Sequence, residues 1–308
     1  MPRRWLFALL ILAFLFATGF TVVRGNVLGM GERFDRLASR IETFVDPPPD
    51  RSTIPTVVVT PAPSPTASPT PRPTVEPSAS PTPSPTPLVR TPVDVAIVDD
   101  HPGVFASQLT DKDCAVAATQ MVLTILGLGN NSETFQQGIK DRIGEWESWE
   151  DSHNGGWGPA AVSLALAAYG EPGYEIRAYT SYTDALRDSA IALTTTDKPV
   201  VMFPWWGAHT WVMTGFRADA DPTLFADAAI SGAYILDPWY PRFSSIWGQS
   251  DGPGNFENLA ELERNWPVYG GPPPYQAIGP GWSRPEGAYP DRDGRFVVLI
   301  PTTPRSDS

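Results

Sequence analysis

The sequence predicts an α+β globular domain at residues 94–308, preceded by a membrane anchor and a proline-rich stalk. Three observations support this prediction. In the globular part, helical patterns come first and β-rich runs follow, which favours α+β over alternating α/β. The N-terminus carries a long uncharged stretch, and 16 of the 35 prolines lie between Pro47 and Pro92.

Residues 1–25 are predicted to be a membrane anchor. Arg3 and Arg4 precede the uncharged stretch Trp5–Val23, which is just long enough to span a bilayer. That stretch is long for a cleavable signal peptide, and no good cleavage site follows it. Positive residues favour the cytoplasmic side, so we expect a single-pass cell-membrane protein whose C-terminal domain is extracytoplasmic. Cleavage of the segment would instead make the protein secreted.

Two segments separate the anchor from the globular domain. Residues 26–45 carry apolar side chains three or four positions apart, which predicts a juxtamembrane amphipathic helix. Residues 46–93 are rich in Pro, Ser and Thr and predict a disordered stalk that joins neither sheet nor helix. In an extended polyproline conformation of about 3.1 Å per residue, this stalk would span on the order of 140 Å, through a wall layer for example.

The globular domain shows helices followed by strands. Helices are predicted at 113–126, 159–169 and 183–194; the first has several candidate N-caps, and the second has Pro159 in its first turn. Strands are predicted at 199–204, 210–216, 233–236 and 295–300 from their β-branched and aromatic runs. The stretch 239–282 is rich in Gly, Pro and aromatics, and we interpret it as a long insertion or lid.

Composition excludes several classes of function. The net charge is −12 and no Lys/Arg-rich run is present, which argues against a nucleic-acid partner. The chain has one cysteine and three histidines, whose spacing fits no zinc pattern, so we expect no metal and no cofactor. A single cysteine also rules out an intramolecular disulfide, so this residue is either buried or chemically active.

Cys114 and Gln108 are the first two candidate catalytic residues. Cys114 falls in the first turn of the first predicted helix, where free N–H groups and the helix dipole favour a thiolate over a thiol. Gln108 lies six residues earlier, where its amide and the Cys114 N–H could form an oxyanion hole. The alternatives are a small buried side chain for Cys114 and a solvated loop residue for Gln108.

His209 and Asp237 complete the candidate site. His209 follows a glycine turn at the start of a strand, a rigid mount for a general base. Asp237 comes just past the next strand and could accept a hydrogen bond from Nδ1–H of that imidazole. A core histidine and a turn-forming Asp-Pro are the alternatives. The chain order of glutamine, cysteine, histidine and aspartate is the papain-like order.

These residues resemble the C39-like branch of papain-like cysteine peptidases. The resemblance rests on the spacing of Gln108 before Cys114 and on the helix that follows, Asp113–Leu123. It also rests on the histidine strand Gly207–Phe216 and on the hydrophobic-hydrophobic-Asp-Pro element Ile235–Pro238. It covers roughly residues 100–300 and implies a papain-like fold, with N-terminal helices packed on an antiparallel sheet. The chain departs from the family pattern at Ala115-Val116, where Gly-Pro is usual, and at Ala208, where Gly is usual.

The resemblance implies a thiol peptidase that hydrolyses peptide or isopeptide bonds through an acyl-thioenzyme, with a peptide or protein substrate. Two alternatives remain: a cell-wall amidase or transpeptidase that uses the same Cys-His-Asp site, and a non-catalytic binding domain on a stalk. Several tryptophans cluster in sequence near His209 and Asp237, and they favour either an aromatic binding wall or ordinary packing; these are Trp205, Trp206, Trp211, Trp239 and Trp247.

Overall fold

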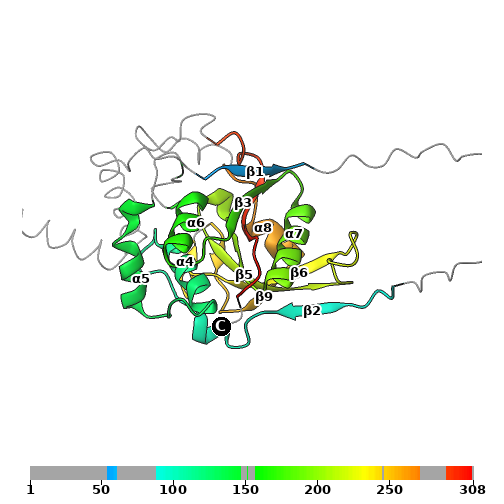
Figure 1. Ribbon diagram of the computed structural model, residues 1–308, viewed down its shortest axis with the longest axis horizontal. Helices are drawn as coiled ribbons and strands as arrows, with labels where there is room; N and C mark the ends of the chain where they lie inside the picture. The colour runs from blue at the N-terminus through cyan, green and yellow to red at the C-terminus, as the bar shows by residue number, and fades with distance from the viewer. Residues whose placement is uncertain are drawn as a thin grey trace, which may run out of the picture.

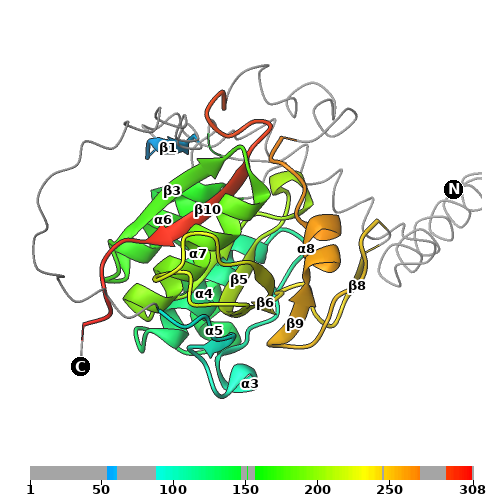
Figure 2. The ribbon, with the colours of Figure 1, turned by 90° about the vertical axis from the view of Figure 1, so that its right-hand side faces the viewer.

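The computed structural model describes residues 54–60, 88–146, 151, 157–244, 246–270 and 289–306. It confirms an α+β domain in which helices pack on a mixed, largely antiparallel sheet (Figures 1 and 2). The predicted anchor at 1–25 and the amphipathic helix at 26–45 lie outside the described residues. Inside the described ranges, no helix combines the length and the apolar character that a membrane span requires.

One eight-stranded sheet forms the centre of the domain. All neighbouring strands are antiparallel except the pair β1–β3, which is parallel, and β2 pairs with the second half of β5 beyond β4. The order is β1 (Thr56–Val59), β3 (Tyr174–Tyr179), β10 (Phe296–Pro301), β4 (Val200–Met202), β5 (Trp211–Ala218), β6 (Ile230–Leu236) and β9 (Asn255–Asn258), with β2 at Val93–Ala96.

Helices cover both faces of the sheet. The family resemblance led us to expect N-terminal helices packed on a sheet, and this is correct for one face only. One face carries α4 (Cys114–Ile125), α5 (Glu133–Lys140) and α6 (Pro159–Ala168), and the other carries α7 (Tyr182–Thr196) and α8 (Leu259–Asn265) (Figure 1). The short elements are α3 (His101–Val104), η2 (Ile143–Glu145), η3 (Trp205–Gly207) and the hairpin β7 (Phe243–Ser244) with β8 (Gly248–Gln249).

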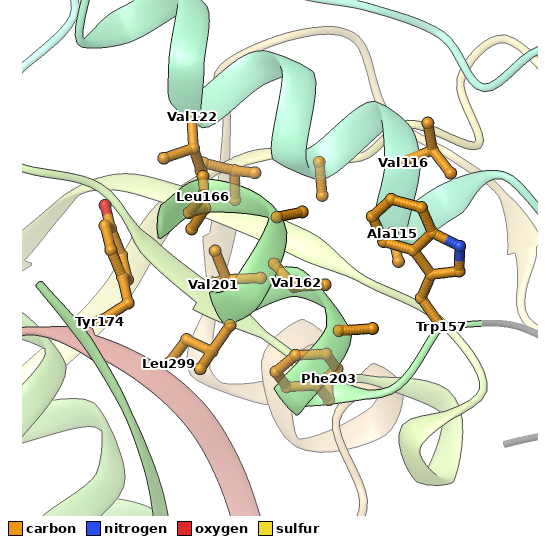
Figure 3. Packing of buried hydrophobic residues seen from close by; sticks show 14 of the residues in the cluster. Ala115, Val116, Val122, Trp157, Val162, Leu166, Tyr174, Val201, Phe203 and Leu299 are labelled. Atoms are coloured by element: carbon orange, nitrogen blue, oxygen red, sulfur yellow. The ribbon is translucent and has the colours of Figure 1, made fainter. Parts of the chain in front are cut away.

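Burial on both faces explains why the central strands are continuous apolar runs. Successive strand residues point to opposite faces, so Val201 and Leu299 join the cluster under α4 and α6, whereas Met202 and Val298 join the cluster under α7. Figure 3 shows side chains of the first cluster gathered between the two helices and the sheet. No polar face is needed on these strands, which is why they lack alternation.

The predicted stalk at 46–93 is wrong in two places. Thr56–Val59 forms β1 and pairs with β3, and Val93 begins β2. Thr56–Val59 is a β-branched run without proline, so its N–H groups are free to join a ladder. β1 and β2 belong to the same sheet, and residues 61–87 between them lie outside the described ranges.

The interpretation of 239–282 as a long insertion or lid is corrected for β9 and α8, which belong to the main fold. This part holds the β7–β8 hairpin, then β9 and α8, and β9 pairs with β6 in the main sheet. Asn258 and Glu261 form a capping box at the start of α8, a helix signal that the Gly- and Pro-rich composition obscured. Residues 271–282 lie outside the described ranges.

Candidate active site

Three elements meet at one edge of the sheet and bring the predicted residues together. Strand β5 begins just after His209, and β6 ends just before Asp237. The two strands are antiparallel neighbours, with Val212 opposite Leu236, so the beginning of one lies beside the end of the other. The loop before α4 joins the same edge, because the Gln108 N–H donates to the Pro238 carbonyl oxygen at 2.9 Å.

Cys114 is the first residue of α4 and is partly exposed. The helical hydrogen-bond series begins where the Ala117 N–H donates to the Asp113 carbonyl oxygen, so the Cys114 N–H is left outside it. The Asp113 side chain does not cap the helix; it accepts hydrogen bonds from the Thr110 N–H at 3.0 Å and from Lys140 at 2.8 Å. A helix N-terminus with free N–H groups therefore adjoins an accessible thiol.

The departures from the family pattern around Cys114 and His209 do not obstruct the thiol. Ala115 and Val116 are buried in the cluster between α4, α6 and the sheet, near Trp157 (Figure 3). Ala208 has a φ of −84°, which any residue adopts, so no glycine is required there.

The turn before His209 holds three consecutive residues in the left-handed region. Trp205 has a φ of 55°, Trp206 of 59° and Gly207 of 85°. This conformation is costly for tryptophan, so the surrounding packing must impose it. The His209 N–H donates to the Pro204 carbonyl oxygen at 3.3 Å and closes the turn. The predicted glycine turn before His209 is confirmed.

His209 and Asp237 form a buried hydrogen-bonded pair. Nε2 of His209 lies 2.6 Å from Oδ1 of Asp237, and both side chains are almost fully buried. The expectation that Nδ1 would make this bond is wrong. The same carboxylate oxygen accepts from the Trp239 N–H at 2.9 Å, so Asp237 both forms a local turn and faces the imidazole.

The thiol of Cys114 lies near the same imidazole. Cys114 acts on the same ring as a second group that raises the pKa of His209, and Nε2 of that ring is taken by Asp237. The Thr210 hydroxyl donates to Sγ of Cys114 at 3.8 Å, a contact that sequence reasoning missed. The cysteine, histidine and aspartate therefore form one connected series.

Asp237 and Cys114 set the charge of the His209 ring. Burial alone would lower the pKa of His209, but the charge and hydrogen bond of Asp237, helped by those of Cys114, outweigh it and raise the pKa to about 9. At neutral pH the ring is therefore an imidazolium held between a carboxylate and a sulfur.

We expect the His209 ring to titrate near pH 9 in an NMR titration of the folded protein. Its folded pKa lies above the ordinary 6.5, so the stability it contributes is fully present below pH 6.5 and is lost as pH rises through about 9. In Asp237→Asn the pKa of the ring should fall well below 9, because the largest contribution that raises it is lost. His101 is the internal control, since burial lowers its pKa. Unchanged titration in Asp237→Asn would show that the carboxylate does not charge the ring.

Gln108 is buried in the loop before α4. Its Nε2 donates to the Thr110 carbonyl oxygen at 2.7 Å, and its Oε1 has no hydrogen-bond partner among the described residues. An amide nitrogen carries two hydrogens, so one remains for an oxyanion. The loop is held from outside by Arg242, which donates to the carbonyl oxygens of Gln108 and Leu109 and pairs with Asp111 at 2.6 Å.

Tryptophan side chains enclose His209. Trp205 stacks on the imidazole with ring centroids 4.1 Å apart and planes 19° apart, and Trp239 meets it edge-on at 6.3 Å. Trp247 lies parallel to Trp205 at 5.9 Å, whereas Trp211 is buried in the cluster under α7. Trp205 and Trp239 therefore pack against His209 and Trp247 packs against Trp205, and an aromatic face on an imidazolium favours the charged ring.

The remaining findings on the site concern metal binding and the comparison with known proteins. Among the described residues, no three His, Cys, Asp or Glu side chains are grouped so that they could hold a metal ion. The model of the Peptidase_C39 like family matches residues 104–272, more than half of the chain, and this range contains all four predicted site residues. No curated protein and no solved structure gave a significant match.

Proposed function

Because the chain belongs to the C39-like peptidase family, we propose that it is a cysteine peptidase whose nucleophile is Cys114 and whose acid–base group is His209. The observation that carries the proposal is the single series of contacts from Asp237 through His209 to a partly exposed thiol. A nucleophile, a base and a group that orients the base are the requirements of covalent acyl transfer.

In the first step the Cys114 thiolate attacks the substrate carbonyl carbon. The S–C bond forms, and the carbonyl oxygen becomes an oxyanion that the Cys114 N–H and the Gln108 amide stabilise. The C–N bond then breaks, and the amine leaves with the proton of the His209 imidazolium. The products of this step are a free amine, a neutral His209 and a thioester on Cys114.

In the second step water hydrolyses the thioester. The neutral His209 removes a proton from water, the new O–C bond forms, and the S–C bond breaks to release the carboxylic acid and the thiolate. Asp237 keeps Nε2–H engaged throughout and so leaves Nδ1 facing the reacting atoms. Asp237 is a positioning residue in this account, and Thr210 supports the sulfur through its hydroxyl.

The proposal also includes an extracytoplasmic location with the membrane as a partner. It is supported by Arg3 and Arg4 before nineteen uncharged residues, Trp5–Val23. The chain should sediment with membranes after a high-salt wash, and a chain that begins at residue 26 should not. Recovery of both in the soluble fraction would remove the anchor from the account.

The test of the enzymatic proposal compares wild type and Cys114→Ala on two substrates. On an unfolded protein, wild type should produce new peptides detectable by mass spectrometry and the variant none. Purified cell wall is the second substrate: release of soluble muropeptides without protein cleavage would favour the amidase alternative. Equal inactivity of both proteins on both substrates would leave the non-catalytic binding domain.

A further inference from the structure

The β7–β8 hairpin displays an apolar surface beside the candidate site. Phe243 is 63% exposed and Ile246 is 58% exposed, and Trp247, next to Ile246, is partly exposed. Single exposed apolar residues are ordinary, but several on one short hairpin form a patch that suits contact with another molecule. The Ser244 hydroxyl accepts from the Ile246 and Trp247 N–H groups, so the turn is locally ordered.

The hairpin contacts both the loop that carries Gln108 and the tryptophans beside His209. On the cysteine side, Arg242 immediately before β7 bonds to the loop that carries Gln108. On the histidine side, Trp247 stacks on Trp205 and meets Trp206 at 4.8 Å. The hairpin therefore holds a fixed position relative to the reacting atoms, which a specificity-determining surface requires.

The position of the leaving amine relative to His209 indicates which part of a substrate the β7–β8 hairpin would contact. His209 gives its proton to the departing amine, so the leaving portion of the peptide lies on the His209 side of the thiol. Trp205 covers the ring of His209, and Trp247 continues that stack toward the hairpin. Trp247 therefore lies on the His209 side of the site, and the exposed Ile246 is its neighbour in the chain.

We propose that Trp206, Trp247, Phe243 and Ile246 form a subsite for a large aliphatic or aromatic side chain in the leaving portion of the substrate. This inference rests on the proposed function and adds a substrate class to it: peptides with a bulky apolar residue shortly after the cleaved bond. Apolar burial of that side chain supplies binding energy that glycine or lysine at the same place lacks.

The experiment measures how amines intercept the acyl-enzyme. The full chain is acylated with an N-acyl amino-acid thioester, and phenylalanine amide, leucine amide, glycine amide or lysine amide competes with water for the thioester on Cys114. In aminolysis the C–N bond forms, the S–C bond breaks, and the amine proton passes to His209. The ratio of amide product to acid product therefore reports on the leaving-side subsite alone.

Wild type should favour phenylalanine amide and leucine amide over glycine amide by roughly tenfold or more. The double variant Phe243→Ser/Ile246→Ser should lose most of this preference, while its thermal unfolding shows that it is folded. The matched control is Leu224→Ser, which removes a 59%-exposed leucine from another loop and should keep the preference.

Each outcome separates the subsite from the enzymatic proposal. Failure of any acyl-enzyme to form on Cys114 would overturn both. An acyl-enzyme with equal partition among the four amines, or a preference that survives in the double variant, would overturn the subsite alone. Loss of binding to anionic lipid vesicles in the double variant, with amine partition unchanged, would assign the hairpin to a membrane surface instead.

Discussion

Replacing His209 with glutamine should lower kcat/KM for peptide hydrolysis by roughly 10⁴-fold. Glutamine can still donate to Asp237, but it carries no charge for the thiolate and no proton for the leaving amine. The loss should therefore fall on the chemical step, with kcat reduced much more than KM is changed. Steady-state kinetics on a peptide found in the cleavage screen measures both constants.

The matched control for that prediction is His101→Gln. His101 lies outside the site, stacks near Tyr234 and contacts the Thr214 hydroxyl at 3.2 Å, so its replacement should leave kcat/KM within a few-fold of wild type. If His209→Gln retained activity within tenfold of wild type, another group would have to supply the proton, and the proposed role of His209 would be lost.

Replacing Arg292 with methionine should cost about 3–5 kcal/mol of unfolding free energy. Arg292 and Asp151 are paired at 2.6 Å, with side-chain exposures of only 4% and 1%. The Asp151 carboxylate also accepts from the Ala160 and Ala161 N–H groups at the start of α6, and Arg292 donates to the Thr56 hydroxyl of β1. The variant leaves the buried Asp151 carboxylate without its cation. It also removes the hydrogen bond between Arg292 and Thr56 of β1.

Chemical denaturation measures the free energy of unfolding of Arg292→Met, which breaks a buried ion pair, and of Arg177→Met, which breaks a partly exposed one. Arg177 pairs with Glu175 at 2.8 Å, but both side chains are partly exposed, so its loss should cost much less. Equal losses in the two variants would mean that the buried pair adds nothing beyond an ordinary surface ion pair.

The sequence was sufficient for the elements that carry strong local signals. The helix at Cys114 and the strands on either side of His209 and Asp237 follow from apolar runs bounded by Gly and Pro. Once β5 and β6 are antiparallel neighbours, the positions just before one and just after the other must meet. This is why His209 and Asp237, 28 residues apart, could be paired from sequence.

Other features depend on tertiary contacts that no local pattern specifies. Thr56–Val59 lies among prolines, and only its pairing with β3 shows that it belongs to the sheet. Nε2 of His209 faces Asp237 just after a left-handed turn at Trp205, Trp206 and Gly207, a conformation that tryptophan does not predict. Arg242 acts on the Gln108 loop more than 130 residues away, so its role is visible only in the fold.

The most direct test of the central claim is the rate at which iodoacetamide modifies the protein at pH 7, followed by intact mass. Cys114 is the only cysteine, so the mass shift reports on it alone. The imidazolium partnership predicts stoichiometric modification, about tenfold faster than in the unfolded chain, and slowed to the unfolded rate or below in His209→Gln. A native thiol that is protected, or one whose rate does not depend on His209, would contradict the account.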